Sequence, residues 1–524
     1  MNYYDSEKKF YIATSIVYAS SIPHIGNIYE IILADVVARF KKMEGYSVYF
    51  QTGTDEHGQK IERKANHKGI PTKIYVDQIS QQIKEIYSQM NIQYDFFVKT
   101  SDLFHKIKVQ NIVNQLKKQN DIYLGVYEGW YSVNEESYIS EKDLINGKTV
   151  HGEIPIWEKE KVYFFKLSRY KKRLLQYLNH DPDLVLPHSI KKEILNLLDK
   201  PLIDLCISRT SLKWGINFQF DPEHTVYVWI DALCNYITGL EYYSQKNNYS
   251  FQAFWPCDLH IIGKDISKFH LIYYPILLMA LNLPLPKKFL IHPWILFNDK
   301  KMSKSLNNVI YVSDLLKIFP VDAIRYFVLN EIPYNSDGIL TYDLLFERYN
   351  KDLVNTLGNL ISRTLGMIVK YKKNHLKKIY PSKETFKISE MIDLEKKSLE
   401  TFSLVKKYMK YYRIGDSLKS IFKLAHLCNK YIDLKKPWEL FKKPEDSDKL
   451  DSTLYNLVET IRFIGVLLQS FLPETSKNIL EQIKSEENTF KSLEYFGITQ
   501  NKELKLEKKL FTRLNKEDFF KKNI

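Results

Sequence analysis

The sequence has few of the residues that build disulfides, metal clusters and membrane spans. Only four cysteines occur, with no close pair among them: Cys206, Cys234, Cys257 and Cys428. This spacing excludes a disulfide framework and the usual cysteine zinc site, so we expect small buried thiols. The longest apolar run, residues 271–283, is short and contains Pro275, which excludes a membrane-spanning helix.

The start of the sequence shows no targeting signal, and glycine is scarce. Residues Met1 to Lys9 contain no apolar core and no arginine-rich presequence, so we expect the protein to reside in the cytoplasm. Glycine occurs only 18 times in 524 residues, a bias typical of coding DNA rich in A and T. The same bias favours lysine, so the net charge of +14 is weak support for a nucleic-acid partner.

The apolar pattern of the first half predicts a parallel α/β sheet. A buried strand is expected at Phe10 to Ile16, a helix at Gly26 to Phe40 ending near Gly45, and a strand at Tyr46 to Thr52. Strand, helix and strand in this order are typical of a Rossmann-type fold. Three later apolar runs continue the pattern: Val226 to Ile230, Leu259 to Gly263 and Phe289 to Phe297.

Two other regions do not follow this pattern of strands and helices. An aromatic, turn-rich region lies between the two groups of strands, which predicts an insertion that splits the sheet. After Pro320, amphipathic segments at 344–371, 395–434 and 452–472 predict a C-terminal α-helical bundle. The lysine-rich tail from Gln500 is expected to be a last amphipathic helix or a frayed end. The expected parts are 1–115 and 226–310 for the two halves of the catalytic domain, 116–225 for the insertion, 311–345 for a stem-contact region, 346–499 for the bundle and 500–524 for the tail.

Pro23 to Asn27 stands where the first strand turns into the first helix. Backbone N–H groups and the positive end of the helix dipole favour an anion there, and His24 and Asn27 add side-chain donors. Gly26 lets a ligand approach the backbone. Taken alone, this tetrapeptide is more often an ordinary turn.

Lys300 to Asn308 is a polar, strongly cationic segment after the last expected strand. Its lysines suit oxygens that become more negative when a phosphate is attacked. A charge run by itself is more often a solvated loop.

Taken together, the two motifs resemble the signature pair of class I aminoacyl-tRNA synthetases, HIGH and KMSKS. Here they are His24-Ile-Gly-Asn27, with Asn in place of the last His, and Lys301-Met-Ser-Lys-Ser305. Asn27 can still donate a hydrogen bond but cannot become cationic. Further strings resemble the methionyl-tRNA synthetases in particular: Tyr18-Ala-Ser-Ser-Ile-Pro-His24, Gly53-Thr-Asp-Glu-His-Gly58, Tyr127-Glu-Gly-Trp-Tyr131, Ser208-Arg-Thr-Ser-Leu-Lys-Trp-Gly215, Tyr227-Val-Trp-Ile-Asp-Ala232 and Ile262-Gly-Lys-Asp-Ile266.

The resemblance implies which residues bind the substrates. For methionine they are Ile16, Tyr18, Asp55, Trp229, Ala232, Leu233, Tyr236 and His270. For ATP, with Mg²⁺ on its phosphates, they are His24, Gly26, Asn27, Glu30, Gly263, Asp265, Lys301, Met302, Ser303, Lys304 and Ser305. Of these, His24, Asn27, Lys301 and Lys304 would stabilise the transition state. Judged singly, Trp229, Tyr236 and His270 are better explained by core packing and Asp55 by loop capping, while Asp265 can be a helix N-cap as well.

The resemblance also concerns metal and RNA. Family members with zinc carry cysteine pairs in the insertion, whereas this chain has Ser132 and Glu135 at the first pair and no second pair. It therefore resembles the zinc-free branch, with the insertion held by packing of Tyr127, Trp130, Tyr131 and Tyr138. In the bundle, Asn359, Arg363 and Trp438 are implied to read the CAU anticodon of the methionine tRNA.

The activity implied is ATP-dependent charging of methionine tRNA, including the initiator, by a monomer. Two alternatives remain open at this point. A related synthetase for Leu, Ile, Val or Cys shares both motifs, but the Tyr227 to Tyr236 string and the lack of a long editing insert disfavour it. A catalytically silent tRNA-binding paralogue is disfavoured by the presence of His24, Gly26, Asp55, Lys301 and Lys304.

Overall fold

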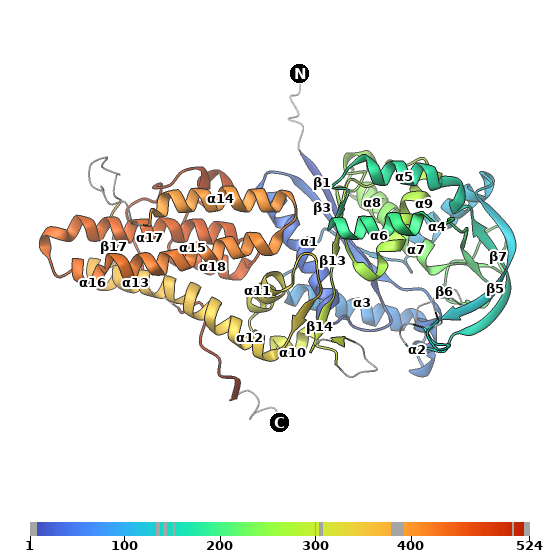
Figure 1. The fold of residues 1–524 in the computed structure, drawn as a ribbon, viewed down its shortest axis with the longest axis horizontal. Coiled ribbons are helices and arrows are strands. Elements are labelled where there is room, and N and C mark those ends of the chain that lie inside the picture. The colour runs from blue at the N-terminus through green and yellow to red at the C-terminus, as the bar shows by residue number, and fades with distance from the viewer. Residues whose placement is uncertain are drawn as a thin grey trace, which may run out of the picture. The chain divides into compact units, whose positions relative to one another are not determined.

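A computed structural model describes residues 8–132, 137–139, 144–149, 152–298, 300–302, 308–378, 392–505 and 508–517. The chain forms two compact units. The first contains Met1–Ala34 and Ser47–His292, and the second contains Asp35–Tyr46 and Pro293–Ile524. Figure 1 shows the sheet and insertion of the first unit in blue and green, and the helices of the second in yellow to red.

A parallel sheet is the centre of the first unit. Its strands are β1 (Lys9–Thr14), β2 (Val17–Tyr18), β3 (Ser47–Asp55), β4 (Phe96–Lys99), β8 (Val185–Leu186), β12 (Leu259–Gly263) and β13 (Phe289–His292). Their order is β2-β3-β1-β12-β13-β8, with β4 also paired to β3, and every pairing is parallel. β12 is buried along its whole length, which explains its unbroken apolar run. The predicted α/β sheet is confirmed.

Helix α1 (Ile25–Met43) follows β1 and β2, as the apolar spacing predicts. Gly45 ends it with a φ of +84°, and Tyr46 N–H bonds the carbonyl of Lys41 at 3.0 Å. Residues to Ala34 belong to the first unit, and Asp35 onward to the second.

Besides α1, the longer helices of the first unit lie between the strands of the parallel sheet in the sequence. They are α2 (Gln59–His67), α3 (Thr72–Gln89), α4 (Leu103–Lys118), α5 (Lys171–His180), α6 (His188–Leu198), α7 (Val228–Leu233), α8 (Asn235–Lys246), η5 (Phe269–Tyr273) and α9 (Tyr274–Ala280). The run Val226 to Ile230 is not a strand of the sheet, because β11 covers only Thr225–Val226 and α7 begins at once. A short helix buried on nearly all sides gives the same apolar run as a buried strand.

The insertion contains an antiparallel sheet, ordered β6-β5-β7-β9. Its strands are β5 (Ile122–Ser132), β6 (Ser137–Ile139), β7 (Ile156–Phe165) and β9 (Leu205–Cys206). Between β7 and β9 the chain returns to the parallel sheet, where β8 pairs with β13. The limits 116–225 for the insertion therefore enclose one strand of the parallel sheet, and the domain limits stay a prediction.

Phe289 to Phe297 is two strands instead of the one expected. Pro293 follows β13 and has no N–H to continue the ladder, so pairing stops there. The second segment of the second unit begins at this proline. In this segment, β14 (Ile295–Phe297) pairs with β15 (Lys300–Lys301) and β16 (Gly338–Leu340).

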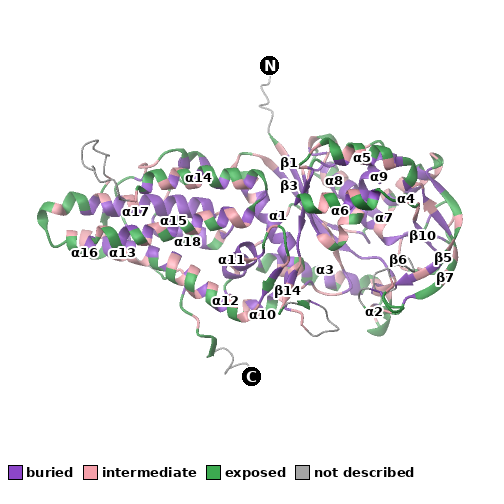
Figure 2. Ribbon diagram, in the orientation of Figure 1, coloured by how far each residue is buried: buried purple, intermediate pink, exposed green. Residues whose placement is uncertain are grey.

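The second unit is mainly helical, which confirms the predicted bundle. Its helices are α10 (Val312–Leu316), α11 (Val321–Glu331), α12 (Tyr342–Arg348), η7 (Tyr349–Gly358), α13 (Asn359–Lys372), α14 (Leu394–Lys410), α15 (Ile414–Lys435), α16 (Pro437–Leu440), α17 (Ser447–Leu468) and α18 (Pro473–Gln482). Figure 2 shows α17 as largely buried, while α14 and α16 are partly exposed. Among the described helices, none is both long and apolar enough to cross a bilayer.

Up to residue 515 the described part of the tail differs from the expected helix or frayed end, while residues 516 and 517 are helical. β18 (Lys502–Glu503) pairs with β17 (His375–Leu376), and residues 508–515 are not helical. Asn350 holds both the N–H and the carbonyl of Leu514, at 3.1 and 2.8 Å, and Phe511 is buried beside Tyr349. Backbone hydrogen bonds and one aromatic anchor, which composition does not reveal, fix this segment.

Candidate active site

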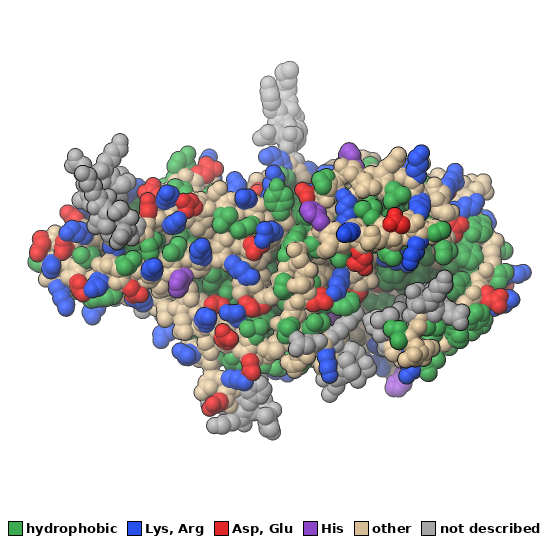
Figure 3. Space-filling model, viewed as in Figure 1, with side chains coloured by type: hydrophobic (Ala, Val, Ile, Leu, Met, Phe, Trp, Pro, Cys, Tyr) green, Lys and Arg blue, Asp and Glu red, His purple; other side chains and the backbone are tan. Residues whose placement is uncertain are grey.

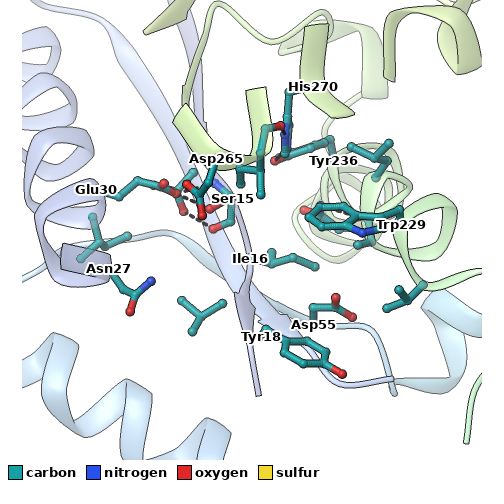
Figure 4. Close-up of a pocket in the computed structure, with 18 of the residues that line it drawn as sticks. Ser15, Ile16, Tyr18, Asn27, Glu30, Asp55, Trp229, Tyr236, Asp265 and His270 are labelled. Carbon is teal, nitrogen blue, oxygen red and sulfur yellow. Dashed lines mark hydrogen bonds between the residues drawn. The ribbon is translucent and has the colours of Figure 1, made fainter. Parts of the chain in front are cut away.

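One cavity of about 290 Å³ opens at the carboxyl ends of β1 and β3. It is lined by all eight residues that the sequence assigns to methionine and by Asn27, Glu30 and Asp265. Figure 4 shows Asn27, Glu30 and Asp265 toward one end, Tyr18, Asp55, Trp229, Tyr236 and His270 toward the other, and Ile16 between them. The position agrees with the rule that open α/β sheets bind ligands beyond the carboxyl ends of their strands.

Sequence reasoning missed several residues that also line this cavity. They are Thr14, Ser15, Val17, Ile31, Tyr87, Val228, Asn235 and Ile266. Ser15 and Val17 lie beside predicted residues in the same segment and could have been found that way. Tyr87 comes from the far end of α3 and gave no signal in the sequence.

Tyr236 and His270 form a buried pair whose protons can be placed. His270 Nδ1 lies 3.0 Å from the carbonyl of Ile266, which only accepts, so Nδ1 carries the proton. Burial lowers the pKa of His270 to about 4, so the ring is neutral and Nε2 accepts from the Tyr236 hydroxyl at 2.8 Å. His270 is thus both a satisfied core histidine and part of the cavity wall.

Asp55 and Trp229 line the cavity at the same end as Tyr236 and His270. Asp55 ends β3, lies opposite Tyr18 in the strand register and is 9% exposed. Trp229 stacks on Phe269 with ring centroids 3.6 Å apart and an interplanar angle of 10°. The cavity therefore combines a carboxylate with aromatic faces, which suits an ammonium group joined to a polarizable thioether.

A second layer of hydrogen bonds supports the wall. Gln51 donates to the side-chain oxygen of Asn235 at 2.8 Å, and Asn235 donates to the carbonyl of Ala232 at 2.6 Å. The Tyr11 hydroxyl donates to the carbonyl of Tyr236 at 3.0 Å. Residues of β1 and β3 thus fix the start of α8.

Glu30 has a structural role beside its place in the cavity. One carboxylate oxygen accepts from the Ser15 N–H at 2.8 Å and the Ser15 hydroxyl at 2.5 Å. The other accepts from the Gly263 N–H and lies 3.0 Å from His292 Nε2. These partners lie at the ends of β1, β12 and β13, so Glu30 joins three strands where the cavity opens.

The first motif lies at the start of α1, as expected, but several of its backbone N–H groups are bonded within the turn. The N–H groups of Asn27 and Ile28 bond the carbonyl of His24, at 2.9 and 3.2 Å. Gly26 N–H donates to His24 Nδ1 at 3.0 Å, which leaves the proton of the imidazole on Nε2. The N–H groups of Gly26, Asn27 and Ile28, expected to face an anion, are thus bonded within the turn.

Gly263 is the last residue of β12, and Asp265 follows it by two residues. Asp265 is exposed within the turn η4 (Lys264–Ile266), whose N-cap position is Gly263, so the alternative of an Asp265 N-cap is wrong. A Cβ at Gly263 would lie 2.8 Å from the Asp265 carboxylate. A side chain at position 263 would therefore crowd the Asp265 carboxylate, which lines the cavity.

The second motif lies largely outside the described residues. Ser303, Lys304 and Ser305 are not described, and of Lys301 only the backbone is, in β15. Met302 is buried in the second unit.

The insertion is held by charge and aromatic packing. Trp130 packs edge-on against Trp157 at 5.1 Å, and the Arg209 guanidinium lies 3.9 Å above the Tyr131 ring. Arg209 also pairs with Glu158 at 2.5 Å, a contact that sequence reasoning missed.

The position of the absent first cysteine pair is part of the same packing. Buried Ser132 donates to the carboxylate of Glu153. Glu135 and the side chain of Tyr138 lie outside the described residues. Among those that are described, no group of three or more His, Cys, Asp or Glu could hold a metal ion.

The three residues assigned to the anticodon lie on the surface of the bundle. Asn359 is exposed at the start of α13, and Trp438 is 37% exposed just after the end of α15. Arg363 pairs with Asp433 of α15 at 2.7 Å, which joins α13 to the last turn before Trp438. Figure 3 shows Lys and Arg spread over the visible face of the helical bundle with Asp and Glu among them.

Comparison with known proteins agrees with this geometry. A family model described as "tRNA synthetases class I (M)" matches residues 10–148 and 139–365. A second, described as "Anticodon binding domain of methionyl tRNA ligase", matches residues 387–520. The chain is similar to a methionine–tRNA ligase of Clostridium perfringens, with 46% identity over 94% of this chain and 76% of that protein.

Further relatives and solved structures agree. A methionine–tRNA ligase of Caldanaerobacter subterraneus is 43% identical over 98% of this chain and 80% of its own. A crystal structure of Mycobacterium tuberculosis methionyl-tRNA synthetase bound by methionyl-adenylate has a TM-score of 0.89 and 34% identity, covering 96% of this chain and 100% of that one. The chain therefore belongs to the methionyl-tRNA synthetases, a family of class I aminoacyl-tRNA synthetases.

Proposed function

We propose that the protein activates L-methionine with ATP to methionyl-adenylate and transfers the methionyl group to the 3′-terminal ribose of tRNA(Met), including the initiator. One observation carries this proposal beyond family membership. Eight residues from β2, β3, α7, α8, η5 and the segment after β1 line a single cavity, and they are the eight that the resemblance assigns to methionine. This supports a working amino-acid site and disfavours a silent paralogue.

In the proposed complex, Asp55 binds the methionine ammonium and Trp229 covers the side chain. Ile16, Tyr18, Ala232 and Leu233 supply apolar walls around the thioether. The Tyr236 proton is engaged by His270, so these two residues present a polar edge to the sulfur without a free proton. A charged or strongly hydrogen-bonding side chain would find no partner there, which favours methionine.

For ATP, His24 Nε2 and the Asn27 amide donate to phosphate oxygens, and the Asp265 carboxylate accepts from ribose hydroxyls. Gly26 and Gly263 keep space for the nucleotide, and Glu30 holds the strand ends beneath it. Mg²⁺ enters with ATP and neutralises part of the phosphate charge when bound.

The reaction needs no protein nucleophile. A methionine carboxylate oxygen attacks the α-phosphorus in line, the bond to the β-phosphate oxygen breaks, and pyrophosphate leaves. A ribose hydroxyl, the 2′ one by the resemblance, then attacks the methionyl carbonyl carbon, and AMP leaves. The protein contributes orientation and charge stabilisation.

The second motif supplies charge to the leaving pyrophosphate, through Lys301 and Lys304 with Met302, Ser303 and Ser305. This part of the proposal rests on the sequence resemblance. Lys304→Ala should slow adenylate formation far more than it weakens methionine binding, because its charge acts mainly as pyrophosphate departs. Equal losses in both would indicate a structural lysine.

On the bundle, Trp438 stacks on an anticodon base while Asn359 and Arg363 read base edges of CAU. The exposure of Asn359 and Trp438 and the partly exposed side chain of Arg363 support this role, because a stacking platform must be open to solvent before RNA binds. We further propose a zinc-free monomer that acts in the cytoplasm, where it meets tRNA. Elemental analysis finding one zinc per chain, or sedimentation as a dimer, would contradict these two points.

The central test is methionine-dependent exchange of pyrophosphate into ATP, followed by charging of tRNA(Met). We expect both activities, with leucine, isoleucine, valine and cysteine failing to replace methionine. Exchange with one of those amino acids would support a related synthetase. Binding of tRNA without any exchange would support the silent paralogue.

A further inference from the structure

A buried cluster of two histidines and one aspartate lies next to the methionine cavity but does not line it. His57 Nδ1 is 2.6 Å from one carboxylate oxygen of Asp231, and His105 Nε2 is 2.7 Å from the other. His105 Nδ1 is in turn 2.7 Å from the hydroxyl of Thr238. The three charged or titratable side chains are at most 3% exposed.

The cluster keeps a carboxylate ionised inside the protein. Burial alone would raise the pKa of Asp231, but the charge of His57 and the hydrogen bonds from both imidazoles lower it to about 2. A buried carboxylate needs a donor at each oxygen, so the two imidazoles fix where Asp231 lies.

Two members of the cluster stand beside residues of the methionine site in the sequence. His57 follows Asp55 by two residues after β3, and Asp231 lies on α7 between Trp229 and Ala232. α7 is six residues long, with Trp229, Ala232 and Leu233 facing the cavity while Asp231 bonds the cluster. A short helix moves as one body, so a displacement of Asp231 would displace Trp229 as well.

The cluster is suited to positioning and not to chemistry. None of its residues lines the cavity. Gln51 of β3 reaches α7 through Asn235, which donates to the carbonyl of Ala232, whereas His57 and His105 contact the Asp231 side chain of α7 directly. The contact between His57 and Asp231 is therefore a direct link between α7 and the segment that carries Asp55.

We propose that Asp231, held by His57 and His105, is a positioning residue that sets the spacing between Asp55 and Trp229 and so determines the KM for methionine. The proposal rests on the proposed function, because it takes this cavity as the methionine site. ATP contacts come from α1 and the turn after β12, so the KM for ATP should respond much less.

The test uses amides that replace one imidazole nitrogen at a time. An asparagine amide can occupy the place of Nδ1, and a glutamine amide that of Nε2. His57 bonds Asp231 through Nδ1 and His105 through Nε2, so His57→Asn and His105→Gln retain the donors, whereas His57→Gln and His105→Asn misplace them. The proposal thus predicts opposite outcomes for the same two substitutions at the two positions.

Pyrophosphate exchange should be measured at varied methionine and at varied ATP for these four variants and Asp231→Asn. We expect Asp231→Asn, His57→Gln and His105→Asn to raise the KM for methionine at least about tenfold and that for ATP less than about twofold, since small misplacements in a site weaken it strongly. His57→Asn and His105→Gln should stay within about threefold of wild type, as should the exposed control His180→Ala.

Thermal unfolding of every variant separates positioning from loss of fold. If Asp231→Asn unfolds, the two pairs of histidine variants still decide, because each pair differs only in which nitrogen is replaced. Equal effects within a pair, or equal changes in both KM values, would overturn the proposal. An inactive wild-type protein would instead refute the proposed function.

Discussion

The polar pair Tyr236 and His270 in the methionine cavity is buried and joined by a hydrogen bond, whereas the side chains assigned to RNA on the bundle are more exposed and loosely held. Tyr236 and His270 are 1% and 3% exposed and share a bond of 2.8 Å. Trp438 and the side chain of Arg363 are each 37% exposed, and Arg363 pairs with a carboxylate that is itself 62% exposed.

This contrast follows from the two ligands. Methionine is small and differs from competing amino acids by a few atoms, so discrimination needs fixed walls and satisfied polar groups. An anticodon loop is large and flexible, and exposed aromatic and cationic side chains can adapt to it. Substitutions in the cavity should therefore cost much more than substitutions on the bundle surface.

The largest effect is expected for Asp55→Ala. Removing the carboxylate leaves the methionine ammonium without a partner in a largely buried site, which costs on the order of 3 kcal/mol or more. We expect kcat/KM for methionine in the exchange assay to fall by at least about 100-fold. The circular dichroism spectrum should be unchanged. Exchange at the wild-type rate would show that Asp55 does not bind the ammonium.

The next largest effect is expected for the pH dependence of the free energy of unfolding that His270 causes. Its pKa is about 4 in the folded protein and 6.5 ordinarily, so the unfolded chain binds more protons between these values. Stability from the neutral ring is therefore complete above pH 6.5 and is lost as the pH falls toward 4. Linkage gives a loss of about 2 kcal/mol between pH 7.5 and 5.

Urea unfolding at both pH values measures this loss. His270→Gln keeps an amide group near Nε2 but does not titrate, so its loss between the two pH values should be smaller by that amount. An identical loss in both proteins would mean that other groups cause it.

Some features of the two regions could be predicted from the sequence, and others could not. The sheet, α1 and the bundle follow from apolar periodicity, and the cavity residues from the family motifs. Pro293 and α7 were assigned to strands, because an apolar run does not reveal which unit it joins or whether it is a short buried helix. Pairing partners such as Arg209 with Glu158 and Ser132 with Glu153 depend on tertiary contacts far apart in the chain.

The site residues show the same limit. The motifs identify Glu30 but not its four donors at the strand ends, and they identify Gly26 but not the imidazole that takes its N–H. A motif gives the type of residue at a position. The direction in which each proton points follows only from the folded neighbours.

On the bundle, Trp438→Ala should reduce charging of tRNA(Met) and leave pyrophosphate exchange nearly unchanged. Loss of stacking on one base costs roughly 1 to 3 kcal/mol, which is about 5- to 150-fold in kcat/KM for tRNA. Trp438→Phe should restore most of the loss, and Tyr495→Ala, an exposed aromatic on the same unit, should have no effect. A thermal midpoint that drops with both activities would instead make Trp438 a packing residue.

The smallest effect is expected for Asp433→Asn, which removes the partner of Arg363. Exposed ion pairs contribute 0 to about 1 kcal/mol, so the thermal midpoint should hardly change. For RNA, the substitution removes a negative charge near the phosphates and frees the Arg363 guanidinium from a competing carboxylate. Both effects act in the same direction, so the KM for tRNA should fall by about two- to threefold, and more at low salt because screening is weaker there. In an Arg363→Ala background the gain should shrink to the charge effect alone, since the two residues share one contact and their effects are then not additive. A KM for tRNA that rises in Asp433→Asn would show that the carboxylate orients Arg363 for the anticodon, and the bundle surface would then be preorganised in the same way as the methionine cavity.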